Sequence, residues 1–216
     1  MNQSEIDWPD AKASAHFHWP DETATERAGL AFAAALGAQT SQIRAGGLVV
    51  GLSGELGSGK TALVRATLRA LGESGPVKSP TYGLLELYVV SSLNFYHFDF
   101  YRFKHPSEFE AAGFRELFGP GAICVIEWPE RAFPAARVAA PDLLFRLHAA
   151  QPGRSVELDA FTDLGVACLR AMTAVPGNPA GQIDQSDRSD PAAPSVPAAP
   201  SPPTAPSTTQ DLDPAP

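Results

Sequence analysis

The stretch Leu48-Val-Val-Gly-Leu-Ser-Gly54-Glu-Leu-Gly-Ser-Gly59-Lys60-Thr61 decides the fold of this chain. Its first part, Leu48–Ser53, is a short continuous apolar run, which is typical of a strand covered on both faces of a sheet. Its second part fits G-x-x-x-x-G-K-[ST], the pattern of the phosphate-binding P-loop. We expect a helix to follow, from Lys60 to about Leu71. A strand, a glycine-rich loop and a helix in this order are the context that a P-loop needs, which makes a chance match the weaker explanation.

Each residue type in this loop has a physical task. Glycines let the backbone turn tightly, so that consecutive N–H groups converge on phosphate oxygens at the positive end of the following helix. Lys60 would bring a full charge to the β- and γ-phosphates of ATP, and Thr61 would offer its hydroxyl to Mg²⁺. The loop residues expected to bind the nucleotide are Gly54, Glu55, Leu56, Gly57, Ser58, Gly59, Lys60, Thr61 and Ala62.

A P-loop that hydrolyses ATP also needs acidic side chains near the metal and the attacking water. Glu127 directly follows the apolar run Ala122–Ile126, where such proteins carry an acidic partner for the metal. Asp99 is the second candidate, because in a strand it would share one face with His97 and Tyr101. That face is either part of a site or the solvated face of an edge strand.

The segment Ser79-Pro80-Thr81 follows the P-loop helix and places two hydroxyls around a proline. One interpretation is a loop that senses the γ-phosphate or positions water, as the switch segments of GTPases do. The other interpretation is the plain beginning of a strand. Trp128 also fits two places, a stack on the nucleotide base or the core, and we favour the core.

The rest of the chain alternates helical and strand patterns. Thr23-Ala-Thr-Glu26 is a capping box that predicts the start of a helix. The runs beginning at Leu48 and Ala122 predict parallel strands. Together these patterns predict an α/β fold, a P-loop NTPase-type sheet with parallel central strands, antiparallel edge hairpins and flanking helices. The other expected elements are helices over Glu22–Leu36, Ser107–Phe118 and Asp163–Met172, and hairpins of Thr81–Val90 with Asn94–Tyr101 and of Leu143–Ala149 with Ser155–Ala160.

Composition divides this chain of 216 residues, with a net charge of −8, into two parts. Residues 1–175 are long enough for one P-loop domain with a sizeable core. Residues 176–216 carry 11 of the 21 prolines, five Asp, one Arg and no aromatic residue. Such a segment cannot bury enough apolar surface to offset its ordering entropy, so we expect a disordered acidic tail.

The composition also excludes several classes of protein. No run of about 18 apolar residues is present to span a membrane, and residues 1–20 lack the apolar core of a secretory signal. Cys124 and Cys168 lie in apolar contexts and indicate buried thiols in a reducing cytoplasm. The acidic balance argues against a dedicated nucleic-acid surface, although an enzyme that handles RNA through partner proteins fits it.

Four blocks of sequence, in this order and spacing, resemble one family. They are Gly54–Thr61, Ser79-Pro-Thr-Tyr82, His97–Arg102 and Ile126-Glu-Trp-Pro-Glu130. The chain resembles TsaE, the bacterial ATPase family of tRNA threonylcarbamoyladenosine biosynthesis, over about residues 18 to 160. Many families share the P-loop, but the other three blocks are not generic. The departures, Glu55 for a usual Asp, Ser58 for a frequent Ala and Phe100 for a common Leu, remove no phosphate or metal ligand.

This resemblance implies a small cytoplasmic ATPase that binds ATP and Mg²⁺. It would support the turnover of two partner proteins, a heterodimer, which transfer a threonylcarbamoyl group to the adenosine next to the tRNA anticodon. It would meet tRNA only indirectly or weakly, and no membrane is implied. By position, Thr61 and Glu127 would hold Mg²⁺, and Asp99, with Thr81 nearby, would organise the attacking water. Lys60 would act on the phosphates, and Glu22 would lie near the adenine.

Two other functions stay open on the residues alone. A small-molecule P-loop kinase would use an arginine-bearing lid, and Arg131 and Arg137 lie in a suitable segment, but no acceptor-binding set is legible. A nucleotide-responsive scaffold would bind ATP without hydrolysing it, which Glu127 and Asp99 argue against. A kinase would consume ATP only with an acceptor metabolite, so turnover assays discriminate among these functions.

Overall fold

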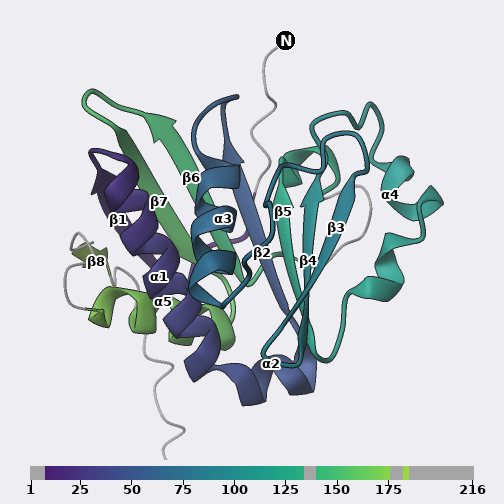
Figure 1. Cartoon of the computed structure of the whole chain (residues 1–216), viewed down its shortest axis with the longest axis horizontal. Coiled ribbons are helices and arrows are strands. Elements are labelled where there is room, and N and C mark those ends of the chain that lie inside the picture. Colours follow the sequence, from purple (N-terminus) through teal and green to yellow (C-terminus); the bar gives the residue numbers. More distant parts are fainter. Residues whose placement is uncertain (1–7, 134–139, 176–181, 185–216) are drawn as a thin grey trace, which may run out of the picture.

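The computed structural model describes residues 8–133, 140–175 and 182–184 (Figure 1). The strands are β1 (Ala13–Trp19), β2 (Leu48–Gly54), β3 (Leu85–Val90), β4 (Leu93–Asp99), β5 (Ala122–Glu127), β6 (Leu143–Ala149), β7 (Arg154–Ala160) and β8 (Gln182–Asp184). The helices are α1 (Glu22–Ala38), α2 (Thr40–Gly46), α3 (Lys60–Ala70), α4 (Ser107–Ala111) and α5 (Asp163–Ala174), with the short 3₁₀ helices η1 (Phe114–Leu117) and η2 (Pro129–Arg131).

The strands form one mixed sheet in the order β3-β4-β5-β2-β6-β7-β1-β8. β2 pairs in parallel with β5 and β6, and β4 pairs in parallel with β5. The remaining pairs are antiparallel. The predicted α/β class with parallel central strands is therefore confirmed. The parallel part is wider than expected, because one strand of each hairpin also pairs with a central strand.

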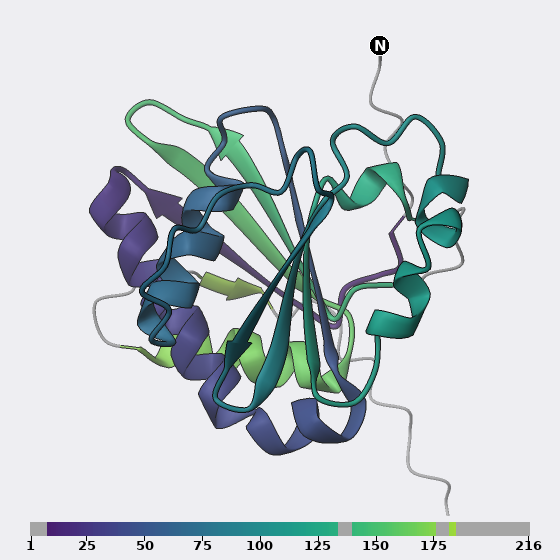
Figure 2. The ribbon, with the colours of Figure 1, turned by 45° about the vertical axis from the view of Figure 1, so that its right-hand side comes forward.

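Apolar side chains are buried on both faces of this sheet. On one face α1, α3 and α5 cover β1, β2, β6 and β7. α1 approaches α3 closely, since a Cβ at Gly29 would lie 2.4 Å from the Cβ of Ala66. On the other face α4, η1 and η2 cover a cluster that is rich in phenylalanine, and Figure 2 shows α4 across the sheet from α1 and α3. Covering on both faces explains the continuous apolar runs of the central strands.

Several predicted boundaries at the start of elements are wrong. The N-cap of α1 is Asp21, whose carboxylate accepts the N–H of Ala24 at 2.8 Å, so the capping box at Thr23 does not form. β3 begins at Leu85 and not at Thr81, because the hydroxyl of Thr81 is bonded to Asp99 and the chain turns there.

Other elements were split or missed by the sequence patterns. The expected helix from Ser107 to Phe118 divides into α4 and η1, separated by Gly113 at a φ of 71°. β1 and α2 have no counterpart among the predicted elements. α2 has only seven residues and no side-chain cap, so it carries little local signal.

Within the predicted tail, Gln182–Asp184 form β8 and pair antiparallel with β1. Low apolar content limits burial, but it does not prevent the backbone of a proline-free stretch from pairing with a strand edge. The rest of the predicted tail lies outside the described residues.

Both cysteines are buried and free, as their apolar contexts predict. Burial raises the pKa of the Cys124 thiol to about 12, and that of Cys168 to about 12, with the charge of Asp142 adding to the effect at Cys168. Within the described ranges, no helix combines the length and the apolar character needed to cross a bilayer.

Candidate functional site

The carboxyl ends of three parallel strands meet at one edge of the sheet. β2 ends at Gly54 and leads into the P-loop, β4 ends at Asp99, and β5 ends at Glu127. A cavity of about 300 Å³ opens at this edge. Its lining residues are Leu56, Gly57, Gly59, Lys60, Thr61, Ala62, Ser79, Thr81, Asp99, Tyr101, Glu127 and Trp128. Residues predicted from separate stretches of sequence thus come together around one space.

A larger cavity, of about 830 Å³, lies where β2 begins, at the opposite edge of the sheet. Apolar side chains and backbone form most of its wall, and its charged side chains already have partners. Asp142 accepts the N–H of Val49 at 2.8 Å and the hydroxyl of Thr162 at 2.6 Å, and Arg115 pairs with Glu110. The groups with reactive chemistry therefore line the smaller cavity.

Lys60 is folded back on the loop that precedes it. Its Nζ donates to the carbonyl oxygens of Gly54 at 2.7 Å and Glu55 at 2.8 Å, and lies 4.0 Å from the centroid of the Trp128 ring. Burial lowers the pKa of this lysine, and the carboxylates of Glu127, Glu130 and Asp99 oppose the shift. A phosphate anion in the cavity would offer the ammonium a full charge in place of carbonyl dipoles.

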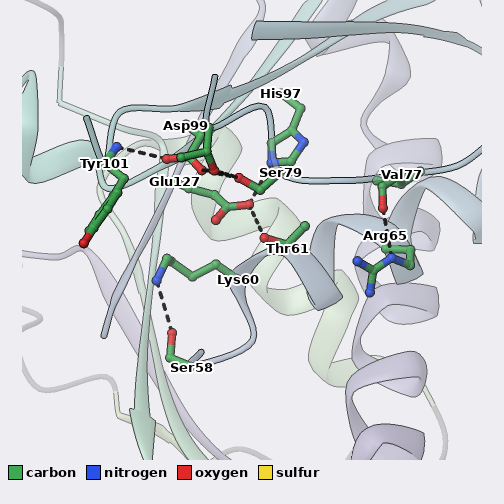
Figure 3. Close-up of polar contacts among 11 residues, drawn as sticks. Ser58, Lys60, Thr61, Arg65, Val77, Ser79, His97, Asp99, Tyr101 and Glu127 are labelled. Atoms are coloured by element: carbon green, nitrogen blue, oxygen red, sulfur yellow. Dashed lines mark hydrogen bonds and ion pairs between the residues drawn. The ribbon is translucent and has the colours of Figure 1, made fainter. Parts of the chain in front are cut away.

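Thr61, Glu127 and His97 form a chain of hydrogen bonds across the bottom of the site (Figure 3). The Thr61 hydroxyl donates to Oε1 of Glu127 at 2.7 Å, and Nε2 of His97 lies 2.9 Å from the same oxygen. Because the Thr61 proton points to Glu127, the lone pairs of the Thr61 oxygen stay available for a cation.

Asp99 ties the Ser79–Thr81 segment to the end of β4. One carboxylate oxygen accepts the hydroxyls of Ser79 and of Thr81, the latter at 2.7 Å, and the other accepts the N–H of Tyr101 at 2.9 Å. His97 and Asp99 are 0% and 3% exposed, so the alternative of a solvated edge-strand face is wrong for both. The structure instead places them in the interior of the sheet, between β3 and β5.

Four of the predicted nucleotide-binding residues do not line the cavity. Gly54 and Glu55 meet it through the carbonyls that hold Lys60, and Ser58 places its hydroxyl 3.4 Å from the lysine Nζ. Glu22 lies exposed in the first turn of α1, away from the lining. The structure therefore gathers the phosphate and metal candidates and leaves Glu22 outside them.

Arg154 is a neighbour of the P-loop that the sequence patterns missed. It begins β7, and its guanidinium donates to the Ser58 carbonyl at 3.1 Å. Gly59 has a φ of 103°, and a Cβ there would lie 1.5 Å from a guanidinium nitrogen of Arg154. The backbone conformation favours glycine at this position, and any larger residue would also displace the end of the flexible Arg154 side chain. No local pattern marks an arginine this far along the chain.

Comparison with known proteins shows the family to which the chain belongs. The family model for "Threonylcarbamoyl adenosine biosynthesis protein TsaE" matches residues 19–156. The chain belongs to the TsaE family. The match contains the P-loop, the Ser79–Thr81 segment and the ends of β4 and β5, so it covers the whole candidate site. The family takes part in tRNA threonylcarbamoyladenosine biosynthesis.

Individual TsaE relatives and a solved structure agree with this assignment. A TsaE protein of Haemophilus influenzae is 40% identical over 126 residues, which are 58% of this chain and 78% of that protein. A TsaE protein of Rickettsia conorii is 41% identical over 83 residues, 38% of this chain and 47% of that protein. The crystal structure of YdiB from Bacillus subtilis shares the fold at a TM-score of 0.54 and 21% identity, over 76% of this chain and 96% of that one.

Proposed function

We propose that this TsaE family member binds Mg²⁺ and ATP at the carboxyl edge of its sheet and hydrolyses the ATP. The observation that carries the proposal is the meeting of Lys60, Thr61, Glu127 and Asp99 around one cavity of about 300 Å³. A lysine and backbone N–H groups are suited to phosphates, and carboxylates are suited to a metal and a water molecule. Few other ligands use both sets at once.

The donors at the bottom of the site fit Mg²⁺. The available oxygens are the Thr61 hydroxyl and the second oxygen of Glu127, and no group of three or more His, Cys, Asp or Glu suited to a metal occurs in the described residues. Mg²⁺ commonly takes one or two protein oxygens and fills its shell with phosphate oxygens and water. When bound, it would neutralise charge that develops on the phosphates. Thr61 and Glu127 are therefore the proposed ligands.

Asp99 and Thr81 are the proposed groups for the attacking water. Both line the cavity, and Thr81 reaches Asp99 through a hydrogen bond of 2.7 Å. Each Asp99 oxygen has more than one acceptor position, so a water could join the hydroxyls already bound there. Asp99 would orient that water and accept its proton. Lys60 would stabilise the charge of the transferred phosphoryl group.

The order of the strands favours one orientation of the bound nucleotide, with its γ-phosphate on the β4 and β5 side of β2. The proposed water-handling residues lie on the β4 and β5 side of β2, and β7 and β1 lie on the other side. Trp19 at the end of β1 pairs with Arg154 on β7, which brings the start of α1 toward the P-loop. If the γ-phosphate faces Asp99, the adenosine extends toward Arg154 and Glu22. This is the proposed place of Glu22 and Ala62 in nucleotide binding.

Membership of the TsaE family supports a role beside partner proteins. We propose that ATP hydrolysis supports the turnover of two partner proteins, a heterodimer that transfers the threonylcarbamoyl group to tRNA in the cytoplasm. The protein itself would meet tRNA indirectly or weakly. The kinase alternative has no added support, because Arg131 lies in η2 and Arg137 lies outside the described residues.

A titration with a fluorescent ADP analogue, with and without Mg²⁺, tests nucleotide binding. We expect Mg²⁺ to strengthen binding to the wild type, and Lys60→Ala to weaken it. Lys104→Ala, which removes an exposed lysine away from the cavity, is the matched control. Equal binding by all three proteins, or none by the wild type, would overturn the proposal. ATP loss only with an added acceptor metabolite would favour a kinase, and binding without turnover would favour a scaffold.

A further inference from the structure

His97 occupies an unusual position for a polar side chain. It lies on β4 between Glu86 of β3 and Val125 of β5, and it is 0% exposed. Its Nδ1 is buried and has no hydrogen-bond partner in the described part of the chain. An unpaired polar atom in the interior costs free energy that an apolar side chain of similar size would avoid. Packing alone therefore does not account for a histidine at this position.

Among the residues that the structure describes, the polar contact of the His97 ring is with Glu127, at 2.9 Å between Nε2 and Oε1. An ionised carboxylate only accepts hydrogen bonds, so Nε2 carries the proton in this contact. Oε1 also accepts the Thr61 hydroxyl at 2.7 Å. Figure 3 shows the other Glu127 oxygen turned away from both donors. Two donors thus hold one oxygen of a carboxylate whose side chain lines the cavity.

We propose that His97 is a positioning residue for the cation site. By holding Oε1 from the side opposite Thr61, it fixes the carboxylate plane so that Oε2 is presented to a cation or to a water bound by it. Outer partners of this kind fix the orientation of metal ligands and change metal affinity by about 10- to 100-fold. The inference rests on the proposed function, because it assumes that Glu127 serves a metal.

The test compares variants that keep or remove the donor at the Nε2 position. His97→Gln can place an amide N–H near that position, whereas the side chain of His97→Asn is one methylene too short to reach Glu127. His97→Leu removes all polar atoms. His16→Gln, at an exposed histidine of β1, is the matched control. Mn²⁺ affinity of the ADP complex is measured by electron paramagnetic resonance, and ADP affinity is measured separately with the metal chelated.

We expect His97→Asn and His97→Leu to weaken Mn²⁺ binding by about tenfold or more, as for other outer partners of metal ligands. Metal-free ADP affinity should stay at the wild-type value, and His97→Gln should recover most of the Mn²⁺ affinity. If His97→Leu fails to fold, the comparison of Gln with Asn still decides. Equal Mn²⁺ affinity in those two variants, or parallel losses of metal and metal-free ADP binding, would overturn the inference. A wild type whose ADP complex binds no Mn²⁺ would instead overturn the proposed function.

Discussion

The hydroxyl of Thr61 donates a hydrogen bond of 2.7 Å to Oε1 of Glu127 and so joins the first turn of α3 to the end of β5. These residues are 66 positions apart in the sequence. The bond brings the last position of the P-loop motif to the carboxylate that follows a buried strand. This contact allows Thr61 of the P-loop and the distant Glu127 to bind the same Mg²⁺, as we propose.

Variants of the two carboxylates, Glu127 and Asp99, should affect different steps, the first nucleotide binding and the second turnover. Glu127→Ala removes a proposed metal ligand, so it should weaken Mg²⁺-dependent ADP binding by about tenfold or more, the effect of losing one charge-assisted contact. Asp99→Asn should leave this binding nearly intact and lower turnover by about a hundredfold or more, the usual contribution of a general base. Mg·ADP affinity and phosphate release are measured for both. Loss of Mg·ADP binding in Asp99→Asn alone would reverse the two roles.

Lys60→Ala should lower nucleotide affinity without unfolding the protein. The variant loses one or two charge-assisted bonds to phosphate, each worth about 1.5–3 kcal/mol, so affinity should fall tenfold or more. The ammonium is bonded to the loop's own carbonyls when no phosphate is bound, and its burial already disfavours the charge. Thermal melting should therefore change little. Unchanged ATP affinity would contradict the P-loop assignment.

Glu130 should make stability depend on pH. Burial raises the pKa of this carboxyl above its ordinary value of 4.5, against the smaller lowering effects of hydrogen bonds with its own backbone and with Ser53 and of the charges of Lys60 and Arg131. Between pH 4.5 and the raised pKa of the folded protein, the folded protein holds a proton that the unfolded chain has lost. The free energy of unfolding therefore falls as pH rises through this interval. Glu130→Gln has no proton to lose, which removes this fall.

Thermal melts of Glu130→Gln and the wild type across pH check this prediction. The melting temperature of the variant minus that of the wild type should increase as pH rises above 4.5. This difference should become constant once Glu130 is ionised in the folded protein. Glu116→Gln, at an exposed site, is the control. A difference that stays constant with pH would show that Glu130 does not titrate in this way.

Truncations should divide the predicted tail at Asp184. Removing residues 185–216, which are proline-rich and poor in apolar side chains, should leave the melting temperature and ATP binding unchanged. A chain that ends at Val175 also loses β8 and should melt slightly earlier, because the edge of β1 loses its partner. A chain that ends at Ala160 loses Cys168, Leu169 and Met172 from the core and should be severely destabilised.

Full stability in the chain that ends at Val175 would show that β8 contributes nothing to the fold. A large loss of stability on removing 185–216 would contradict the prediction from composition.

Patterns that depend on local burial could be found in the sequence. β2 and β5 are covered on both faces and therefore appear as apolar runs, and the P-loop follows from fixed residue types at fixed spacing. Because the ends of parallel strands meet at one edge, Glu127 could be expected near the loop. Asp99 was a candidate only through the strand face that it shares with His97 and Tyr101. β1 was missed although its polar and apolar residues alternate and Pro-Asp pairs flank it at residues 9–10 and 20–21.

Features that depend on tertiary contacts could not be found in this way. Arg154 reaches the P-loop across 96 positions of sequence, and an arginine after a Pro-Gly turn is ordinary in itself. The parallel pairing of β4 with β5 comes in addition to the expected hairpin of β3 with β4, and no local pattern indicated it. The burial of Glu130 follows from η2, which starts where Trp128 takes a φ of 61°. Each of these is decided by how distant segments pack.

Phosphate release from ATP in the presence of Mg²⁺ tests the central claim most directly. It is measured for the wild type alone, for the wild type with the two partner proteins, and for Lys60→Ala with the same partners. We predict slow release by the chain alone, faster release with the partners, and loss of the increase in Lys60→Ala. If release with the partners equals that of the partners without this chain, or if Lys60→Ala matches the wild type, the site at Lys60, Thr61 and Glu127 is not that of a partner-dependent ATPase.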